Sequence, residues 1–143
     1  MNQAKPVLLV EDNPADEKLA LLAFRKLGIP YQIEVARDGE EALDYLFGNE
    51  RKSGSKPYPI IIIMDLRLPK VDGLEILAKI RENPETQMIP VIVFTTSSDA
   101  GDIRNSYLSG ANSFISKPVD LDEFDELIEM TMTYWLEYNQ YPL

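Results

Sequence analysis

A run of apolar residues from Ile60 to Met64 leads directly into a carboxylate, Asp65, and this step constrains the fold more than any other feature. Pro59 precedes the run, and a turn-forming segment from Pro69 to Gly73 follows it. A short continuous apolar stretch between turn formers is typical of a strand buried on both faces, as in a parallel sheet. Asp65 is therefore expected at the carboxyl end of that strand, the edge where open α/β sheets bind ligands.

Strands and helices are predicted to alternate along the whole chain. The apolar segments that predict strands are residues 7–10, 33–35, 59–65, 90–95 and 113–116. Cap residues or glycines that predict helix starts are Asn13, Asp38, Asp72 or Gly73, Gly101 and Asp120. The last helix is expected to bury one apolar stripe, formed by Leu121, Phe124, Leu127, Ile128 and Trp135.

Five strands alternating with five helices indicate an α/β fold with a doubly wound parallel sheet, because right-handed crossovers cover both faces of such a sheet. We expect the flavodoxin-like strand order 2-1-3-4-5. The 143 residues fit a single domain, with a core at about 7–136, an extended surface loop at 49–58 and a C-terminal tail at 137–143.

Composition excludes several kinds of chemistry. The chain has no cysteine and no histidine, which removes disulfides, Cys/His zinc sites and any catalytic arrangement based on a thiol or an imidazole. Its net charge of -10 repels nucleic-acid phosphates, so no direct nucleic-acid binding is expected. The N-terminus lacks an apolar signal core, and no apolar run is long enough to span a membrane. We expect a cytoplasmic protein without membrane contact.

Polar side chains follow the strands that the predicted order places side by side. Glu11 and Asp12 end the first strand, Asp65 the third and Thr95 the fourth, while Lys117 ends the fifth. Three clustered carboxylates need a counterion, and Mg²⁺ prefers such oxygen ligands while keeping positions open for a phosphoryl oxygen. Asp65 is then a candidate nucleophile for phosphoryl transfer, with Lys117 and Thr95 placed to contact the phosphoryl group.

Four segments together resemble a response-regulator receiver domain of two-component signalling. They are LLVEDN at 8–13, MDLRLPKVDG at 64–73, VFTTS at 93–97 and SFISKP at 113–118. Each segment alone is weak evidence, but all four occur in order and at predicted strand ends. The resemblance covers about residues 7 to 136 and implies a phosphoaccepting switch rather than an enzyme.

The resemblance also implies individual roles. Asp65 matches the phosphoacceptor, Lys117 the phosphate-contacting lysine, Thr95 the switch hydroxyl and Phe114 the switch aromatic residue, often a tyrosine in the family. The residues that match the Mg²⁺ ligands are Asp12 and Asp65 directly, the backbone carbonyl of Arg67, and Glu11 through water. The family leads us to expect a cis bond between Lys117 and Pro118.

Two positions that vary in the family, Arg67 and Ser97, look out over the phosphoryl group and affect the access of water. The long loop before the third strand, the TTS triplet and the aromatic last helix resemble the stand-alone regulators paired with bacterial phytochrome histidine kinases. That resemblance implies a sensor histidine kinase as partner. It also suggests a homodimer through the helix at 101–108, the strand at 113–116 and the last helix.

Other functions were weighed against the same residues. An aspartyl-nucleophile phosphatase of the haloacid dehalogenase type needs a second Asp two residues after the nucleophile, where this chain has Arg67. A flavodoxin-like cofactor binder needs a phosphate-cradling loop after the first strand, but EDNPADE is acidic. A phosphate-independent interaction module remains an alternative.

Simpler structural explanations compete with functional ones for three features. Asp72 is expected to act only as a helix cap. The acidic residues at 120–126 fit a solvated helix start rather than a second metal site. For the aromatic residues Tyr134, Trp135, Tyr138 and Tyr141, covering the core and forming a partner surface both stay open.

Overall fold

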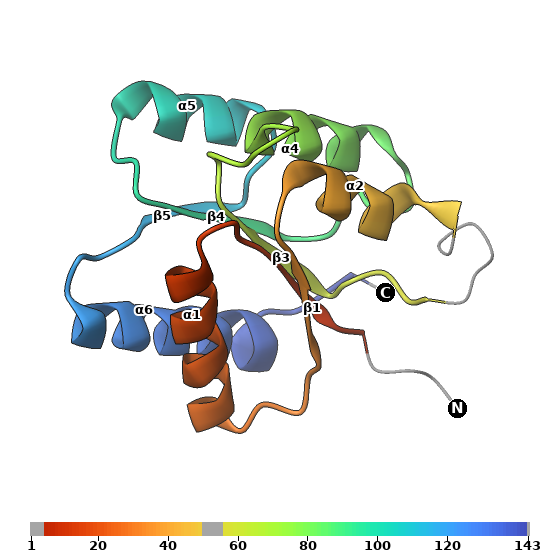
Figure 1. Ribbon diagram of the computed structural model, residues 1–143. Helices are drawn as coiled ribbons and strands as arrows, with labels where there is room; N and C mark the ends of the chain where they lie inside the picture. Colours follow the sequence, from red (N-terminus) through yellow and green to blue (C-terminus); the bar gives the residue numbers. More distant parts are fainter. Residues whose placement is uncertain (1–4, 50–55, 143) are drawn as a thin grey trace.

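The computed structural model describes residues 5–49 and 56–142, and its described part contains one parallel five-stranded sheet (Figure 1). The strands are β1 (Val7–Val10), β2 (Ile33–Ala36), β3 (Ile61–Met64), β4 (Val91–Thr95) and β5 (Ser113–Ser116). Their order in the sheet is β2-β1-β3-β4-β5, with every neighbouring pair parallel. The predicted fold class and strand order are confirmed.

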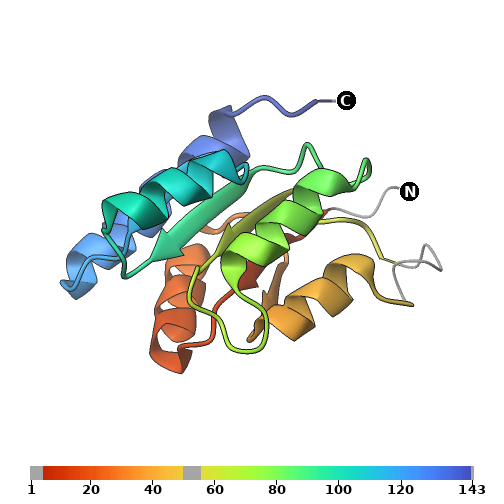
Figure 2. The ribbon, with the colours of Figure 1, turned by 90° about the horizontal axis from the view of Figure 1, so that it is seen from above.

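Helices cover both faces of this sheet. The helices are α1 (Pro14–Leu27), α2 (Gly39–Phe47), α4 (Gly73–Glu82), α5 (Ala100–Leu108) and α6 (Leu121–Thr133). Figure 1 shows α1 and α6 below the sheet and α2, α4 and α5 above it, and Figure 2 shows the latter three side by side. Each crossover returns the chain to the same end of the sheet, so every strand ends at one edge.

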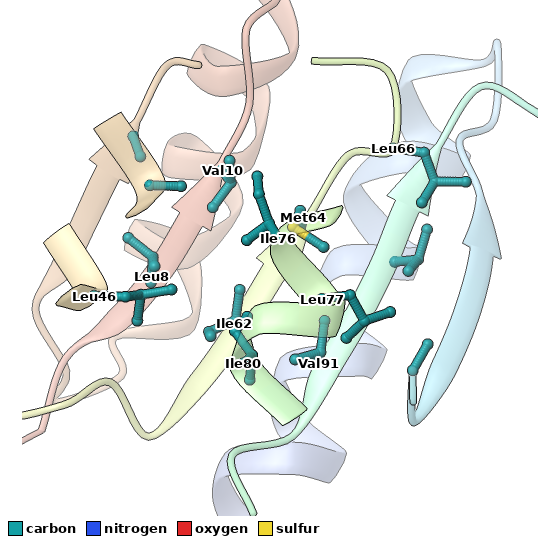
Figure 3. Close-up of a cluster of buried hydrophobic side chains, with 14 residues drawn as sticks. Leu8, Val10, Leu46, Ile62, Met64, Leu66, Ile76, Leu77, Ile80 and Val91 are labelled. Atoms are coloured by element: carbon teal, nitrogen blue, oxygen red, sulfur yellow. The ribbon is translucent and has the colours of Figure 1, made fainter. Parts of the chain in front are cut away.

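The alternation of side chains along the strands explains why the central strands are apolar throughout. Leu8, Ile62 and Met64 point to the face covered by α2 and α4, where they meet a buried cluster (Figure 3). Ile61 and Ile63 point to the other face and pack with residues of α1 and α6. A strand with helices on both sides has no solvated face, which accounts for the Ile60 to Met64 run.

Most predicted helix boundaries agree with the structure. Asn13 caps α1, because its side chain accepts hydrogen bonds from the backbone N–H groups of Ala15 and Asp16, and Gly28 ends the helix in a left-handed conformation. Asp38 caps α2 in the same way. Asp72 precedes α4, but its side chain makes no capping hydrogen bond. Asp72 is therefore the N-cap residue of α4, as predicted, but its backbone carbonyl, and not its side chain, accepts the hydrogen bonds of the first turn.

The last helix departs from prediction at both ends. Leu121, predicted to be buried, is 64% exposed because it lines a surface groove between α1 and α6 instead of reaching the core. Phe124, Ile128 and Met132 form the buried stripe of α6. Beyond Thr133 the backbone widens into a π-helical turn, η1 (Tyr134–Tyr138).

The C-terminal tail returns toward the end of the sheet opposite the strand carboxyl ends. The Tyr141 hydroxyl donates a 2.6 Å hydrogen bond to the Trp135 carbonyl, and Tyr141 lines a groove with Pro59 and Pro90. Most of the predicted surface loop at 49–58 lies outside the described residues, which exclude 50–55. Within the described part of the chain, no helix is long and apolar enough to cross a bilayer.

Candidate phosphoacceptor site

The strand register places the predicted site residues next to one another. Val10 pairs with Met64 across β1 and β3, so Glu11 and Asp65 both begin the loops that leave the same edge of the sheet. The backbone N–H of Asp65 donates to the Val10 carbonyl at 3.0 Å, which extends the pairing by one residue. Thr95 ends the next strand, β4. Five residues predicted from their positions after strands, namely Glu11, Asp12, Asp65, Thr95 and Lys117, thus gather at this edge.

The buried Lys117 ammonium is the cation at the centre of the site. Its Nζ lies 2.7 Å from Glu11 Oε1, 2.8 Å from Asp65 Oδ2 and 2.9 Å from Asp16 Oδ2. Its side chain is 4% exposed, so three carboxylates replace the water that normally solvates an ammonium group. Lys117 therefore joins the ends of β1, β3 and β5 to the first turn of α1.

Burial and ion pairing act in opposite directions on the ionisation of this cluster. Burial raises the pKa of Glu11 to about 7, although the hydrogen bond and charge of Lys117 act to lower it. Burial alone would lower the pKa of Lys117, but hydrogen bonds to Asp65, Glu11 and Asp16 outweigh this effect. The pKa of Lys117 is therefore raised. Lys117 stays charged near neutral pH, while Glu11 can hold a proton.

An acidic group beside Lys117 has the composition of a divalent-cation site. Glu11, Asp12 and Asp65 each offer a carboxylate oxygen, and these three oxygens all lie within 4.8 Å of one another. Asp12 is exposed, whereas Glu11 and Asp65 are buried, so the group is open toward solvent on the Asp12 side. Because oxygen ligands with one open side suit a hard divalent cation, the three residues fit such an ion. A contribution from the Arg67 carbonyl stays a prediction.

The Thr95 hydroxyl lacks a hydrogen-bond partner, alone among the buried side-chain oxygen and nitrogen atoms of the described residues. Thr95 is fully buried at the end of β4. Buried polar groups are normally paired, so an orphaned hydroxyl is an acceptor or donor available to a ligand. Phe114, on β5, is partly buried and packs against the cluster on the α4 face of the sheet.

The loop between β3 and α4 keeps close to Asp65. Gly73 begins α4 so near this loop that an added Cβ would lie 2.7 Å from the Asp65 carbonyl oxygen and 2.8 Å from Leu66 Cα. The backbone N–H of Gly73 also donates to the Leu66 carbonyl at 3.0 Å. The backbone N–H of Arg67 donates to Asp65 Oδ1 at 3.3 Å. Glycine is therefore required where the helix meets the turn after Asp65.

Two acidic residues of the site were missed by sequence reasoning. Asp16 contacts Lys117, and Asp102 accepts hydrogen bonds from both Arg67 and Ser97. Each lies in the first turn of a helix, where a carboxylate is already explained by the helix dipole. Only their positions at the same sheet edge as Asp65 could have suggested a second role.

The expected cis bond between Lys117 and Pro118 is wrong, since no peptide bond in the described residues is cis. A trans bond before proline is intrinsically favoured by about 0.5–1 kcal/mol. With this bond trans, Lys117 still reaches Asp65, so the observed contacts do not require the cis form.

A family model described as the response regulator receiver domain matches residues 7–129. The chain belongs to this family. Members of the family are signalling switches rather than classical enzymes, as the sequence predicted. The match spans all five strands and includes every candidate site residue from Glu11 to Lys117.

Individual relatives agree with this assignment. A probable methanogenesis regulatory protein, FilR2 of Methanothrix harundinacea, is 42% identical over 136 residues, which cover 95% of this chain and 86% of that protein. Response regulator Rcp1 of Synechocystis is 35% identical over 136 residues, covering 95% of this chain and 92% of Rcp1. The predicted resemblance to phytochrome-associated regulators is confirmed by the structural neighbours.

Two solved structures show the same fold. The Mn²⁺-bound form of Rcp1 is 34% identical with a TM-score of 0.90, covering 98% of this chain and 100% of that one. The phosphorylated cyanobacterial phytochrome response regulator RcpA is 35% identical with a TM-score of 0.91, and the match covers 99% of this chain and 100% of RcpA.

The raised pKa of Glu11 predicts a pH-dependent contribution to stability. Between pH 4.5, its ordinary pKa, and about 7, its folded pKa, the folded state binds more protons than the unfolded state. The contribution of Glu11 is thus complete below pH 4.5 and declines as the pH rises through 7. In metal-free buffer, the free energy of unfolding of the wild type minus that of Glu11→Gln should fall across this range. Urea titrations measure it, and a constant or rising difference would contradict the assignment.

Proposed function

We propose that the chain is a stand-alone, single-domain response regulator in which Asp65 accepts a phosphoryl group from a histidine kinase. The observation that carries the proposal is the setting of the Asp65 carboxylate. One oxygen contacts Lys117 at 2.8 Å, and Glu11 and Asp12 place oxygens within 4.8 Å on the side suited to a cation. A nucleophile between two positive groups is favoured for phosphoryl transfer, because charge on the transferring group must be neutralised.

In the proposed reaction, an Asp65 oxygen attacks phosphorus, and the bond between phosphorus and the imidazole nitrogen of the donor breaks. The donor histidine must belong to another protein, because this chain has none. A bound Mg²⁺ would supply positive charge to the phosphoryl oxygens, held by Asp12, Asp65 and the Arg67 carbonyl, with Glu11 acting through water. Lys117 would exchange its contact with the Asp65 carboxylate for a phosphoryl oxygen, and Thr95 would donate its unpartnered hydroxyl.

The proposed output is a change in a protein-interaction surface. Once the Thr95 hydroxyl moves toward the phosphoryl group, it leaves space on the α4 side of β4 that the Phe114 ring can fill. Phe114 lies on β5, which is the edge strand next to β4 and which contacts α5. Tyr107 and Leu108 are exposed on α5, which gives this surface apolar area for a homodimer through α5, β5 and α6.

We also propose a kinase partner and a cytoplasmic location for this response regulator. The relative RcpA is named a phytochrome response regulator, which supports a sensor histidine kinase, of the bacterial phytochrome type, as the donor. Such a kinase presents its phosphohistidine in the cytoplasm, so the regulator would act there without contacting nucleic acid or membrane. Two alternatives are less well supported. Arg67, which pairs with Asp102, stands where a dehalogenase-type phosphatase needs its acid, and the orphaned Thr95 hydroxyl argues against a phosphate-independent module.

Phosphorylation at Asp65 is tested with acetyl phosphate and Mg²⁺. Wild type should gain the mass of one phosphoryl group, and Asp65→Asn should gain none, because the amide is not a nucleophile. Asp72→Asn is the matched control, since Asp72 lies on the same loop and its side chain makes no capping hydrogen bond. Intact-mass spectrometry measures the mass gain of all three proteins. Equal mass gain in wild type and Asp65→Asn would disprove the assignment.

The role of Thr95 is tested by sedimentation. Phosphorylation of the wild type should tighten dimerisation by about 5- to 150-fold, the usual range for coupled sites. Thr95→Ala should still be phosphorylated but should lose most of this tightening. A concentration series of both proteins, with and without the phosphoryl group, separates these effects. If the wild type stays monomeric in both states, dimerisation is not the output.

A further inference from the structure

A single carboxylate oxygen joins the loop that begins with Asp65 to the neighbouring loop after β4. Asp102 Oδ2 accepts a 2.7 Å charged hydrogen bond from Arg67 Nη2 and a 2.6 Å hydrogen bond from Ser97 Oγ. Arg67 follows Asp65 by two residues on the loop after β3, and Ser97 follows Thr95 by two residues on the loop after β4. We call these three side chains the Asp102 bridge.

Asp102 is anchored at the start of α5. It is the third residue of α5, and its backbone N–H donates to the side chain of Asp99, which caps that helix. Its side chain is only 17% exposed. The hydrogen bond from Ser97 and the charge of Arg67 lower the pKa of Asp102, so the carboxylate stays ionised near neutral pH.

Ser97 is fixed in turn by other contacts on its own loop. Its hydroxyl oxygen accepts a hydrogen bond from the backbone N–H of Asp99 at 3.2 Å. Its carbonyl accepts one from the Ser116 hydroxyl at 3.0 Å, which ties the loop to the end of β5. The Arg67 side chain is 69% exposed, and among the described residues its guanidinium pairs with Asp102 alone. Asp102 is therefore what sets the position of the Arg67 guanidinium.

We propose that Asp102 is a positioning residue that keeps Arg67 and Ser97 bridged across the mouth of the Asp65 site and thereby slows hydrolysis of an aspartyl phosphate. This inference rests on the proposed function. In hydrolysis, a water oxygen attacks phosphorus in line with the bond from phosphorus to Asp65, that bond breaks, and inorganic phosphate leaves. The attacking water must arrive opposite Asp65, between the loops that the Asp102 bridge joins.

The Asp102 bridge is expected to contribute little to protein stability or to cation binding. An ion pair with one partner mostly in solvent contributes little to stability, so its loss should not unfold the protein. Asp102 lies outside the acidic group of Glu11, Asp12 and Asp65, so its loss should also leave cation binding unchanged. The expected effect is thus on the lifetime of the phosphoryl group, with the melting temperature and the Mg²⁺ dependence of phosphorylation as readouts that should not move.

The test follows loss of the phosphoryl group by intact mass after acetyl phosphate is removed. Asp102→Ala should lose it about threefold faster or more, the size expected when one exposed ion pair and one hydrogen bond disappear. Asp102→Asn keeps the shape and an acceptor oxygen and should lie between Asp102→Ala and wild type. Glu123→Ala is the matched control, because Glu123 is the third residue of α6 and contacts none of the site residues.

Arg67→Ala separates positioning from a general effect on the helix. It should shorten the lifetime like Asp102→Ala, and the double variant should be no faster than either single variant, because both changes open the same bridge. Equal lifetimes in wild type and Asp102→Ala, or a longer lifetime in Asp102→Ala, would overturn the inference and leave phosphorylation at Asp65 intact. A wild type that accepts no phosphoryl group would overturn the proposed function and this inference together.

Discussion

The Lys117 ammonium is surrounded by carboxylates from three separate segments of the chain, and the rest of the site depends on that charge. Glu11 and Asp65 follow neighbouring strands, and Asp16 lies in the first turn of α1, so each would repel the others without a cation between them. Removing one partner of a buried charged group commonly costs about 3–5 kcal/mol, because the remaining charges are left unpaired. The contacts of Lys117 therefore stabilise this edge of the sheet.

The same crowding gives the site its chemistry. Glu11, Asp16 and Asp65 contact one ammonium group, and Asp12 adds a further carboxylate beside Glu11 and Asp65. This leaves an excess of negative charge that a divalent cation can neutralise. In the proposed reaction, a bound cation would neutralise part of the charge on Glu11 and Asp65, and Lys117 would then be free to contact a phosphoryl group. The fold favours the proposed exchange, because the apolar, buried strands β1 and β3 hold Glu11 and Asp65 at one edge and exclude water from beneath them.

Most of the fold and the centre of the site could be predicted from sequence, because both depend on short-range patterns. The apolar run before Asp65 indicates a buried strand, and parallel topology then brings Glu11, Asp65 and Thr95 to one edge. The partners of Asp16 and Asp102 could not be predicted in this way. Both residues satisfy a local rule at a helix start, and their contacts with Lys117 and Arg67 come from loops far away in the chain.

Other predictions failed because a local sequence pattern was overridden by tertiary structure. Leu121 continues the apolar stripe of α6 by spacing, yet it lines a surface groove and is 64% exposed. The trans bond before Pro118 shows that a feature taken from family resemblance need not accompany the side-chain contacts that it was expected to produce.

The central claim is that Lys117 and a divalent cation neutralise the same carboxylates, and the stability of Lys117→Met measures this directly. Methionine keeps most of the side-chain volume and removes the charge. The increase in melting temperature produced by Mg²⁺ should be larger in Lys117→Met than in wild type, because the variant leaves more repulsion for the cation to relieve. An equal or smaller increase in the variant would contradict the claim, since Lys117 and the cation would then act on separate charges.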